Sequence, residues 1–122
     1  MSRNLDVIDR YFTAINSEDW PALALLWHRD VEWRATGARP RRGKEDVLTY
    51  YPRALALYPK HHDDPARIID AGETITVEIV FTGETRDAKP IRFDAVDVFD
   101  FEDGLIRGFS SWFDLDELRR QL

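Results

Sequence analysis

The sequence of 122 residues predicts an α+β fold. Its first half places apolar residues at helical spacing, whereas its second half alternates apolar and polar residues, as strands do. An Asp103-Gly104 pair between two alternating segments indicates a tight hairpin. We therefore expect three N-terminal helices on one face of a curved antiparallel sheet of roughly four to six strands, followed by a short C-terminal helix.

Three segments have helical patterns. The first carries one apolar stripe, formed by Leu5, Ile8, Phe12 and Ile15. The second is expected to begin at Asp19, a good N-cap, with Pro21 in its first turn and an end near Leu26. The third covers about residues 44–57, and we expect Pro52 to kink or split it because proline lacks a backbone donor.

The remaining segments read as strands and turns. A loop is expected at 37–43, and the predicted strands are 31–33, 67–70, 74–82, 91–101 and 105–113. Asp114 and Glu117 form a capping box that opens a C-terminal helix ending at Leu122.

Composition excludes several classes of function. The net charge of −6 disfavours nucleic acid as a partner, because phosphate backbones repel an acidic chain. The absence of cysteine excludes disulfides, thiolate metal sites and cysteine nucleophiles. No apolar run is long enough to cross a bilayer, so we expect a cytoplasmic protein without a membrane partner.

Asp97 is the residue that stands out. In the segment 91–101, one face of the predicted strand carries Ile91, Phe93, Ala95, Asp97, Phe99 and Phe101. Asp97 should therefore point inward, where burial raises the pKa of a carboxyl and lets it donate or move a proton. The alternatives are that Asp97 lies at an open rim, or bonds to a backbone amide or to Tyr11.

Other candidates surround this predicted strand. Tyr11 could reach the same cavity with its hydroxyl, although a buried tyrosine with a satisfied hydroxyl is more common. Ser111 should share a face with Leu105, Arg107, Phe109 and Phe113. The run from His61 to Asp64 has metal-ligand residue types, but adjacent strand residues point to opposite faces, so no metal site is expected.

Several segments resemble the nuclear transport factor 2-like superfamily, which includes ketosteroid isomerases and SnoaL-like polyketide cyclases. The segments are 11–19, 30–33, 43–47 and 96–106, and the resemblance covers nearly the whole chain. It implies one domain, residues 1–122, with the cone-shaped, cystatin-like roll of that superfamily. Family members commonly dimerise through the convex face of the sheet, so we expect a homodimer through a face that carries Thr76, Val80, Val96, Val98 and Trp112.

The resemblance carries over only part of each catalytic set. In ketosteroid isomerase, a tyrosine and a protonated aspartic acid form the oxyanion hole, and they match Tyr11 and Asp97. The general-base position of that enzyme falls near Ala35. The acid/base aspartate of SnoaL-like cyclases and the catalytic aspartate of limonene epoxide hydrolase both match Ser111, while the water-holding pair of the hydrolase matches Trp33 and Ala35.

We expect an enzyme that isomerises, cyclises or hydrolyses a small, mostly apolar carbonyl- or epoxide-bearing ligand without a cofactor. Asp97 would be the proton donor or shuttle, with Tyr11 as its hydrogen-bonding partner. The substrate-binding walls would be Trp33, Tyr51, Phe93, Phe109, Ser111 and Phe113. The alternative is a non-catalytic ligand-binding or dimerisation module with the same fold.

Overall fold

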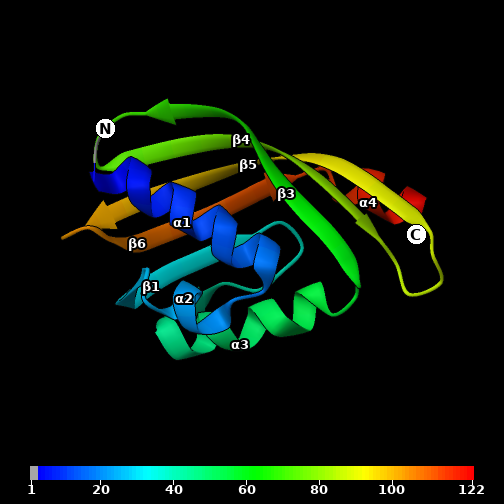
Figure 1. Ribbon diagram of the computed structural model, residues 1–122, viewed down its shortest axis with the longest axis horizontal. Helices are drawn as coiled ribbons and strands as arrows, with labels where there is room; N and C mark the ends of the chain where they lie inside the picture. The colour runs from blue at the N-terminus through cyan, green and yellow to red at the C-terminus, as the bar shows by residue number, and fades with distance from the viewer. Residues whose placement is uncertain (1–2) are drawn as a thin grey trace.

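The computed structural model describes residues 3–122 and confirms the α+β class. The elements run in the order α1 (Arg3–Ser17), α2 (Trp20–Ala24), β1 (Trp27–Ala35), β2 (Arg41–Arg42), α3 (Lys44–Leu55), β3 (Lys60–Asp70), β4 (Thr74–Glu84), β5 (Pro90–Glu102), β6 (Leu105–Phe113) and α4 (Leu115–Gln121). The strands form one six-stranded sheet in the order β2-β1-β6-β5-β4-β3. Figure 1 shows this sheet curving over the helices.

The helix ends follow the signals in the sequence. The Asp19 side chain accepts a hydrogen bond from the backbone of Ala22 at 3.1 Å, and Asp114 accepts one from Glu117, also at 3.1 Å. Of the two expected effects of Pro52, a kink or a split, the split is wrong, because α3 runs through this residue as one helix. Pro52 lies in the last turn, where a proline removes only one bond before the helix ends.

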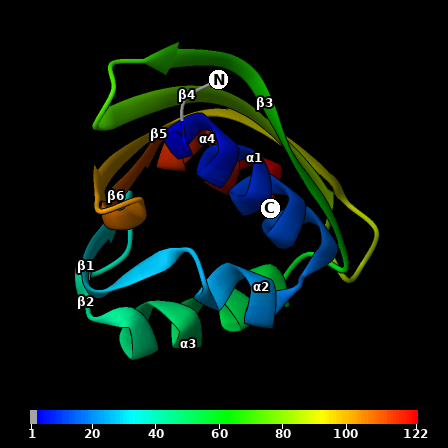
Figure 2. The same ribbon diagram turned by 60° about the vertical axis from the view of Figure 1, so that its left-hand side comes forward.

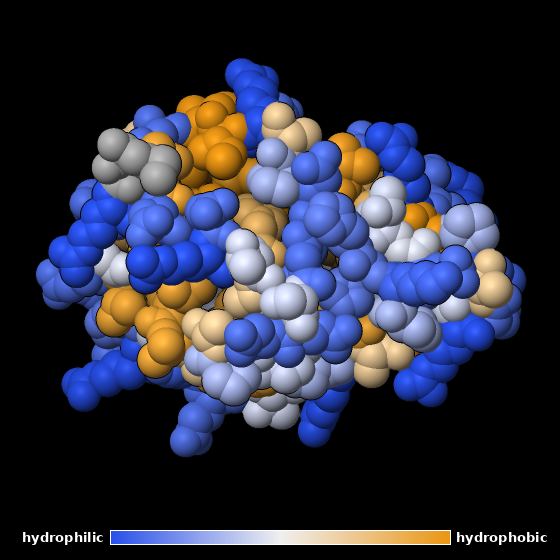
Figure 3. All heavy atoms as spheres, in the orientation of Figure 1, coloured by the Kyte–Doolittle hydropathy of each residue, from blue (hydrophilic) through white to orange (hydrophobic). Residues whose placement is uncertain are grey.

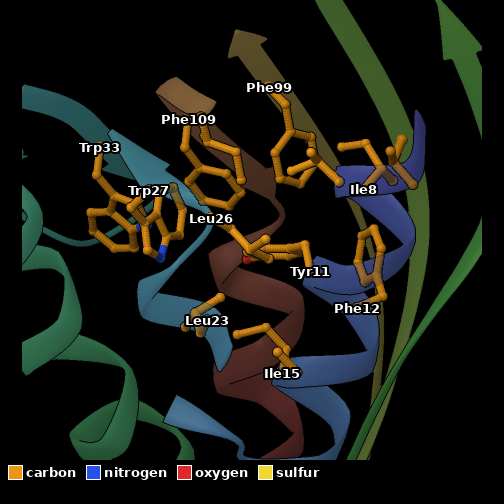
Figure 4. Close-up of a cluster of buried hydrophobic side chains, with 14 of the residues drawn as sticks. Ile8, Tyr11, Phe12, Ile15, Leu23, Leu26, Trp27, Trp33, Phe99 and Phe109 are labelled. Atoms are coloured by element: carbon orange, nitrogen blue, oxygen red, sulfur yellow. The ribbon is translucent and has the colours of Figure 1, made fainter. Parts of the chain in front are cut away.

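The helices and the sheet enclose the core. Figure 2 shows α1 inside the curve of the sheet, while α2 and α3 lie across its open side. In Figure 4, side chains of α1 such as Ile8 and Phe12 face Phe99 and Phe109 from the strands. These residues are all buried, so one core joins the helical layer to the sheet.

The sheet differs from the prediction in four ways. β1 is longer than 31–33, residues 41–42 form a short strand inside the expected loop, and β3 begins at Lys60 instead of Arg67. β1 also pairs with β6 in parallel, so the sheet is mixed and not purely antiparallel. Parallel strands need a long connection, and here most of the chain lies between the two partners.

The inward face of β5 is the predicted one, but that of β6 is not. Phe93, Ala95, Asp97, Phe99 and Phe101 point inward. The β5–β6 register shifts between Asp100 and Phe101 of β5, which pair with Gly108 and Ile106 of β6, and Ile106 is buried. The expected shared face of Leu105, Arg107 and Phe109 is therefore wrong, because an extra residue in one strand reverses the alternation.

Polar and apolar residues are mixed on the surface. Figure 3 shows one face, on which hydrophobic areas are separated by hydrophilic residues. Among residues 3–122, no helix is long and apolar enough to span a membrane.

Candidate functional site

A cavity of about 330 Å³ lies between the inner face of the sheet and the helices. Its lining includes all eight residues singled out in the sequence: Tyr11, Trp33, Tyr51, Phe93, Asp97, Phe109, Ser111 and Phe113. They come from α1, α3, β1, β5 and β6, so residues far apart in the chain meet at one place. The volume suits a small ligand, and nine of the residues that line the cavity are aromatic.

Asp97 lies in the wall of this cavity, and the residue is buried. The residue is 5% exposed, which excludes a position at an open rim. Its Oδ1 atom has no hydrogen-bond partner among residues 3–122, and the hydrogen bond that acts on its carboxyl comes from the Ser111 side chain and not from a backbone amide. Burial raises the pKa of Asp97 to about 8, the nearby Ser111 hydroxyl partly offsets this increase, and repulsion from Asp63 adds to it. The carboxyl is therefore protonated at neutral pH and has a proton to give.

The Tyr11 hydroxyl pairs with another residue than expected. It lies 2.8 Å from the Tyr51 hydroxyl, and the Trp33 indole N–H donates to Tyr51 at 3.2 Å. The predicted hydrogen bond between Tyr11 and Asp97 is thus replaced by a Tyr11–Tyr51–Trp33 chain. Burial raises the pKa of both tyrosines, which stay neutral.

Among residues 3–122, the hydrogen bonds that join Tyr11, Tyr51 and Trp33 leave one hydroxyl hydrogen atom without an acceptor. The two tyrosine hydroxyls carry two hydrogen atoms, and the bond between them uses one. The second has no acceptor within the described part of the chain. A ligand carbonyl or alkoxide beside Tyr11 and Tyr51 would supply that acceptor, as in an oxyanion hole.

Asp63 is the cavity residue that sequence reasoning missed. It lies on β3, opposite Phe81 of β4, and its side chain lines the same cavity. Burial raises the pKa of Asp63 to about 6, although the neighbouring His61 and His62 lower it. Repulsion from Asp63 and from Asp97 raises the pKa of Tyr11, so both carboxyls act on this hydroxyl. In the sequence, this segment stood out only because residues 61–64 are of types that bind metal ions.

The buried His61 side chain lies beside a carboxylate. Its side chain is 3% exposed, and its Nε2 atom lies 3.1 Å from a carboxylate oxygen of Glu18. Among residues 3–122, no group of three or more histidine, cysteine, aspartate or glutamate side chains could hold a metal ion.

Comparison with known families agrees with this architecture. The model of the SnoaL-like domain matches residues 8–109. The chain belongs to the SnoaL-like domain family. No curated protein sequence matches the chain significantly.

Solved structures share the fold at low sequence identity. An NTF2-like protein of unknown function from Burkholderia pseudomallei superposes with a TM-score of 0.92 at 21% identity, over 99% of this chain and 98% of that chain. An LEH-like epoxide hydrolase from M. tuberculosis gives 0.84 at 18% identity, over 98% and 89% of the two chains. IdmH from Streptomyces antibioticus, assigned as a polyketide cyclase, gives 0.87 at 19% identity, over 98% of each chain. These proteins therefore share the NTF2-like fold with this SnoaL-like chain.

Proposed function

We propose that this SnoaL-like protein is an enzyme that moves protons on a small, mostly apolar ligand without a cofactor. The ligand carries a carbonyl or an epoxide, and the reaction is an isomerisation, a cyclisation or a hydrolysis. The observation that carries this proposal is the Asp97 carboxyl, which is buried, lacks a partner for Oδ1 and faces a cavity. An unpaired buried polar group costs stability, so a ligand that pairs with it is favoured.

Asp97 is the proton donor in this proposal. Its pKa of about 8 keeps it protonated at neutral pH while leaving it able to transfer the proton. The spare hydrogen of the Tyr11–Tyr51 pair donates to the same ligand oxygen. Trp33, Phe93, Phe109 and Phe113 hold the apolar part, and Ser111 lies beside Asp97 across the β5–β6 ladder.

The fold supports this class of chemistry without selecting one reaction. Proteins named as an epoxide hydrolase and as a polyketide cyclase share the architecture. Ala35 and Ser111 line the cavity where the resembled catalytic sets place carboxylates. That departure favours a second candidate, a binding module that holds the ligand without converting it.

An isomerisation assay separates the two candidates. Cyclohex-3-enone is a suitable probe, because its conversion to the conjugated ketone needs only proton movements. We expect turnover by the wild type and a loss of roughly two to four orders of magnitude in Asp97→Asn, which cannot transfer a proton. An equal rate in the two proteins would leave Asp97 as a hydrogen-bond donor only. Binding of the ketone without turnover would favour the binding module.

Carbon-13 NMR titration of the Asp97 carboxyl is an independent check. We expect its inflection near 8. A value below the ordinary 3.8 in the free protein would contradict the proposal, because the group would then be ionised at neutral pH.

A further inference from the structure

The proposed chemistry needs a base, and neither Ala35 nor Ser111 can accept a proton from carbon. We propose that Asp63 is the base that removes the proton from the ligand, facing Asp97 as the donor across the same cavity. This inference rests on the proposed function, because it assigns the second group of the same acid/base pair. The two carboxyls are the only ones that line the cavity among the described residues.

The backbone of Asp63 is held firmly in place. The Asn16 amide of α1 accepts from the Asp63 backbone N–H at 2.8 Å and donates to its carbonyl at 2.9 Å. On its other side, Asp63 pairs with Phe81 in the β3–β4 ladder. Both the helix and the strand thus orient the residue, while its carboxyl remains free to contact a ligand.

The charged and titratable groups around Asp63 favour opposite protonation states for the two acids. From β3, His61 and His62 lower the pKa of Asp63, and the Glu18 carboxylate, in the turn after α1, lies 3.1 Å from His61. Tyr11 from α1 and Asp97 from β5 lie on the cavity side, and Arg119 of α4 also lines the cavity. With pKa values of about 6 and about 8, Asp63 is ionised and Asp97 protonated at neutral pH. Two carboxyls with separated pKa values can act as base and acid.

The proton balance needs no further reactant. The Asp63 carboxylate takes a proton from the carbon next to the carbonyl, and the electron pair of that C–H bond forms a carbon–carbon double bond. The carbonyl oxygen becomes an enolate, which accepts the proton or hydrogen bond of Asp97. Asp63 then returns its proton to another carbon of the ligand, and Asp97 recovers its own, so both carboxyls end as they began.

Ring opening of 5-nitrobenzisoxazole tests the base directly, without the natural substrate. A base takes the ring C–H proton, the electron pair forms the nitrile, the N–O bond breaks, and the oxygen leaves as a coloured phenolate. We expect kcat/KM of the wild type to rise with pH through an inflection near 6, as Asp63 ionises. In Asp63→Asn, kcat/KM should fall by roughly two to four orders of magnitude.

Asp64→Asn is the matched control. Asp64 is the next residue on β3, and it is exposed on the opposite face of the strand. We expect this variant to keep the wild-type rate and pH profile. The two hydrogen bonds of the Asn16 side chain involve only backbone atoms of residue 63, so Asp63→Asn should stay folded. Circular dichroism checks this.

The outcomes separate the two proposals. Retention of the rate in a folded Asp63→Asn, with loss in Asp97→Asn and an inflection near 8, would overturn Asp63 as base and leave Asp97 at a catalytic cavity. No acceleration over free acetate, with the cavity resonances shifted by bound probe, would overturn both. Equal loss in Asp64→Asn would also overturn the inference, because that residue faces away from the cavity.

Discussion

Two hollows of similar volume lie on opposite faces of the same strands. The inner cavity measures about 330 Å³, and the outer hollow, between β3, β4, β5 and β6, measures about 320 Å³. Both contain carboxyls: Asp63 and Asp97 inside, and Glu78 and Asp94 outside. The outer hollow includes Trp112, which is 46% exposed.

The surroundings of the two sets of carboxyls differ. Glu78 pairs with Arg67 at 3.2 Å, and Asp94 is exposed to water. Asp97 is three residues from Asp94 on the same strand, yet it lies among aromatic rings with one oxygen unpaired. Because both faces of the sheet carry carboxyls, it is the curvature of the sheet and the helices covering its inner face that set the chemistry of each acid. Four predictions test this contrast.

The largest effect is expected from Asp97, the more deeply buried carboxyl of the inner cavity. The pKa of Asp97 rises from 3.8 in the unfolded chain to about 8 on folding, so the folded state binds the extra proton between these values. Stability is therefore lost as pH rises from about 4 to about 8, by at most ~6 kcal/mol from this group. In Asp97→Asn, the free energy of unfolding, measured in urea at several pH values, should vary less with pH. Asp94→Asn is the outer control, and equal pH dependence in the wild type and Asp97→Asn would contradict the contrast.

The second prediction concerns the outer hollow. We propose that its apolar residues, with Val96 and Trp112 at the centre, form the interface of a homodimer. Val96→Glu adds a carboxylate beside Glu78 and Asp94 in both copies, so the dimer Kd should rise about 100-fold, or ~2.7 kcal/mol. Light scattering over a range of concentrations gives the mass, with Leu25→Glu, at the C-cap of α2, as the control. A monomeric wild type at micromolar concentration would refute the proposal.

The third prediction returns to the inner wall. Tyr51→Phe removes the hydroxyl that pairs with Tyr11 and accepts from Trp33, leaving two buried polar groups without a partner. We expect a loss of about 1–3 kcal/mol in the free energy of unfolding. Tyr50→Phe is the neighbouring control, because its ring contacts Trp33 but its hydroxyl is not part of the chain of hydrogen bonds. Equal losses in both variants would mean that the hydrogen bonds contribute little.

The smallest effect is expected from Asp100, an exposed carboxyl that already has a hydrogen-bond partner. Asp100 accepts a hydrogen bond from Thr74 at 2.6 Å and is exposed. Asp100→Asn keeps an acceptor at this place, so the free energy of unfolding should change by less than about 0.5 kcal/mol. Thermal unfolding measures the change. A loss as large as that of Tyr51→Phe would show that the outer face tolerates changes no better than the inner one.

The site divides into a part that local patterns predict and a part that they do not. Alternation along β5 alone places Asp97 on the apolar face with Phe93 and Phe99, and the structure agrees. Asp63 escaped prediction because the strand that carries it begins with a polar run, Lys-His-His-Asp-Asp, which has no apolar alternation. The hydrogen bond between Tyr11 and Tyr51 joins residues 40 positions apart, which no local pattern reports.

The sequence alone was sufficient for the fold class, the main helices, the inward face of β5 and the position of the β5–β6 hairpin, because each depends on the spacing of residues a few positions apart. The parallel pairing of β1 with β6, the bulge that turns Ile106 inward, and the meeting of Asp63 with Asp97 depend on contacts across the chain. Those contacts arise when the strands pair and the sheet curves around α1, and curvature brings side chains from separate strands to one cavity. That step sets how deeply each carboxyl is buried, and burial sets its pKa.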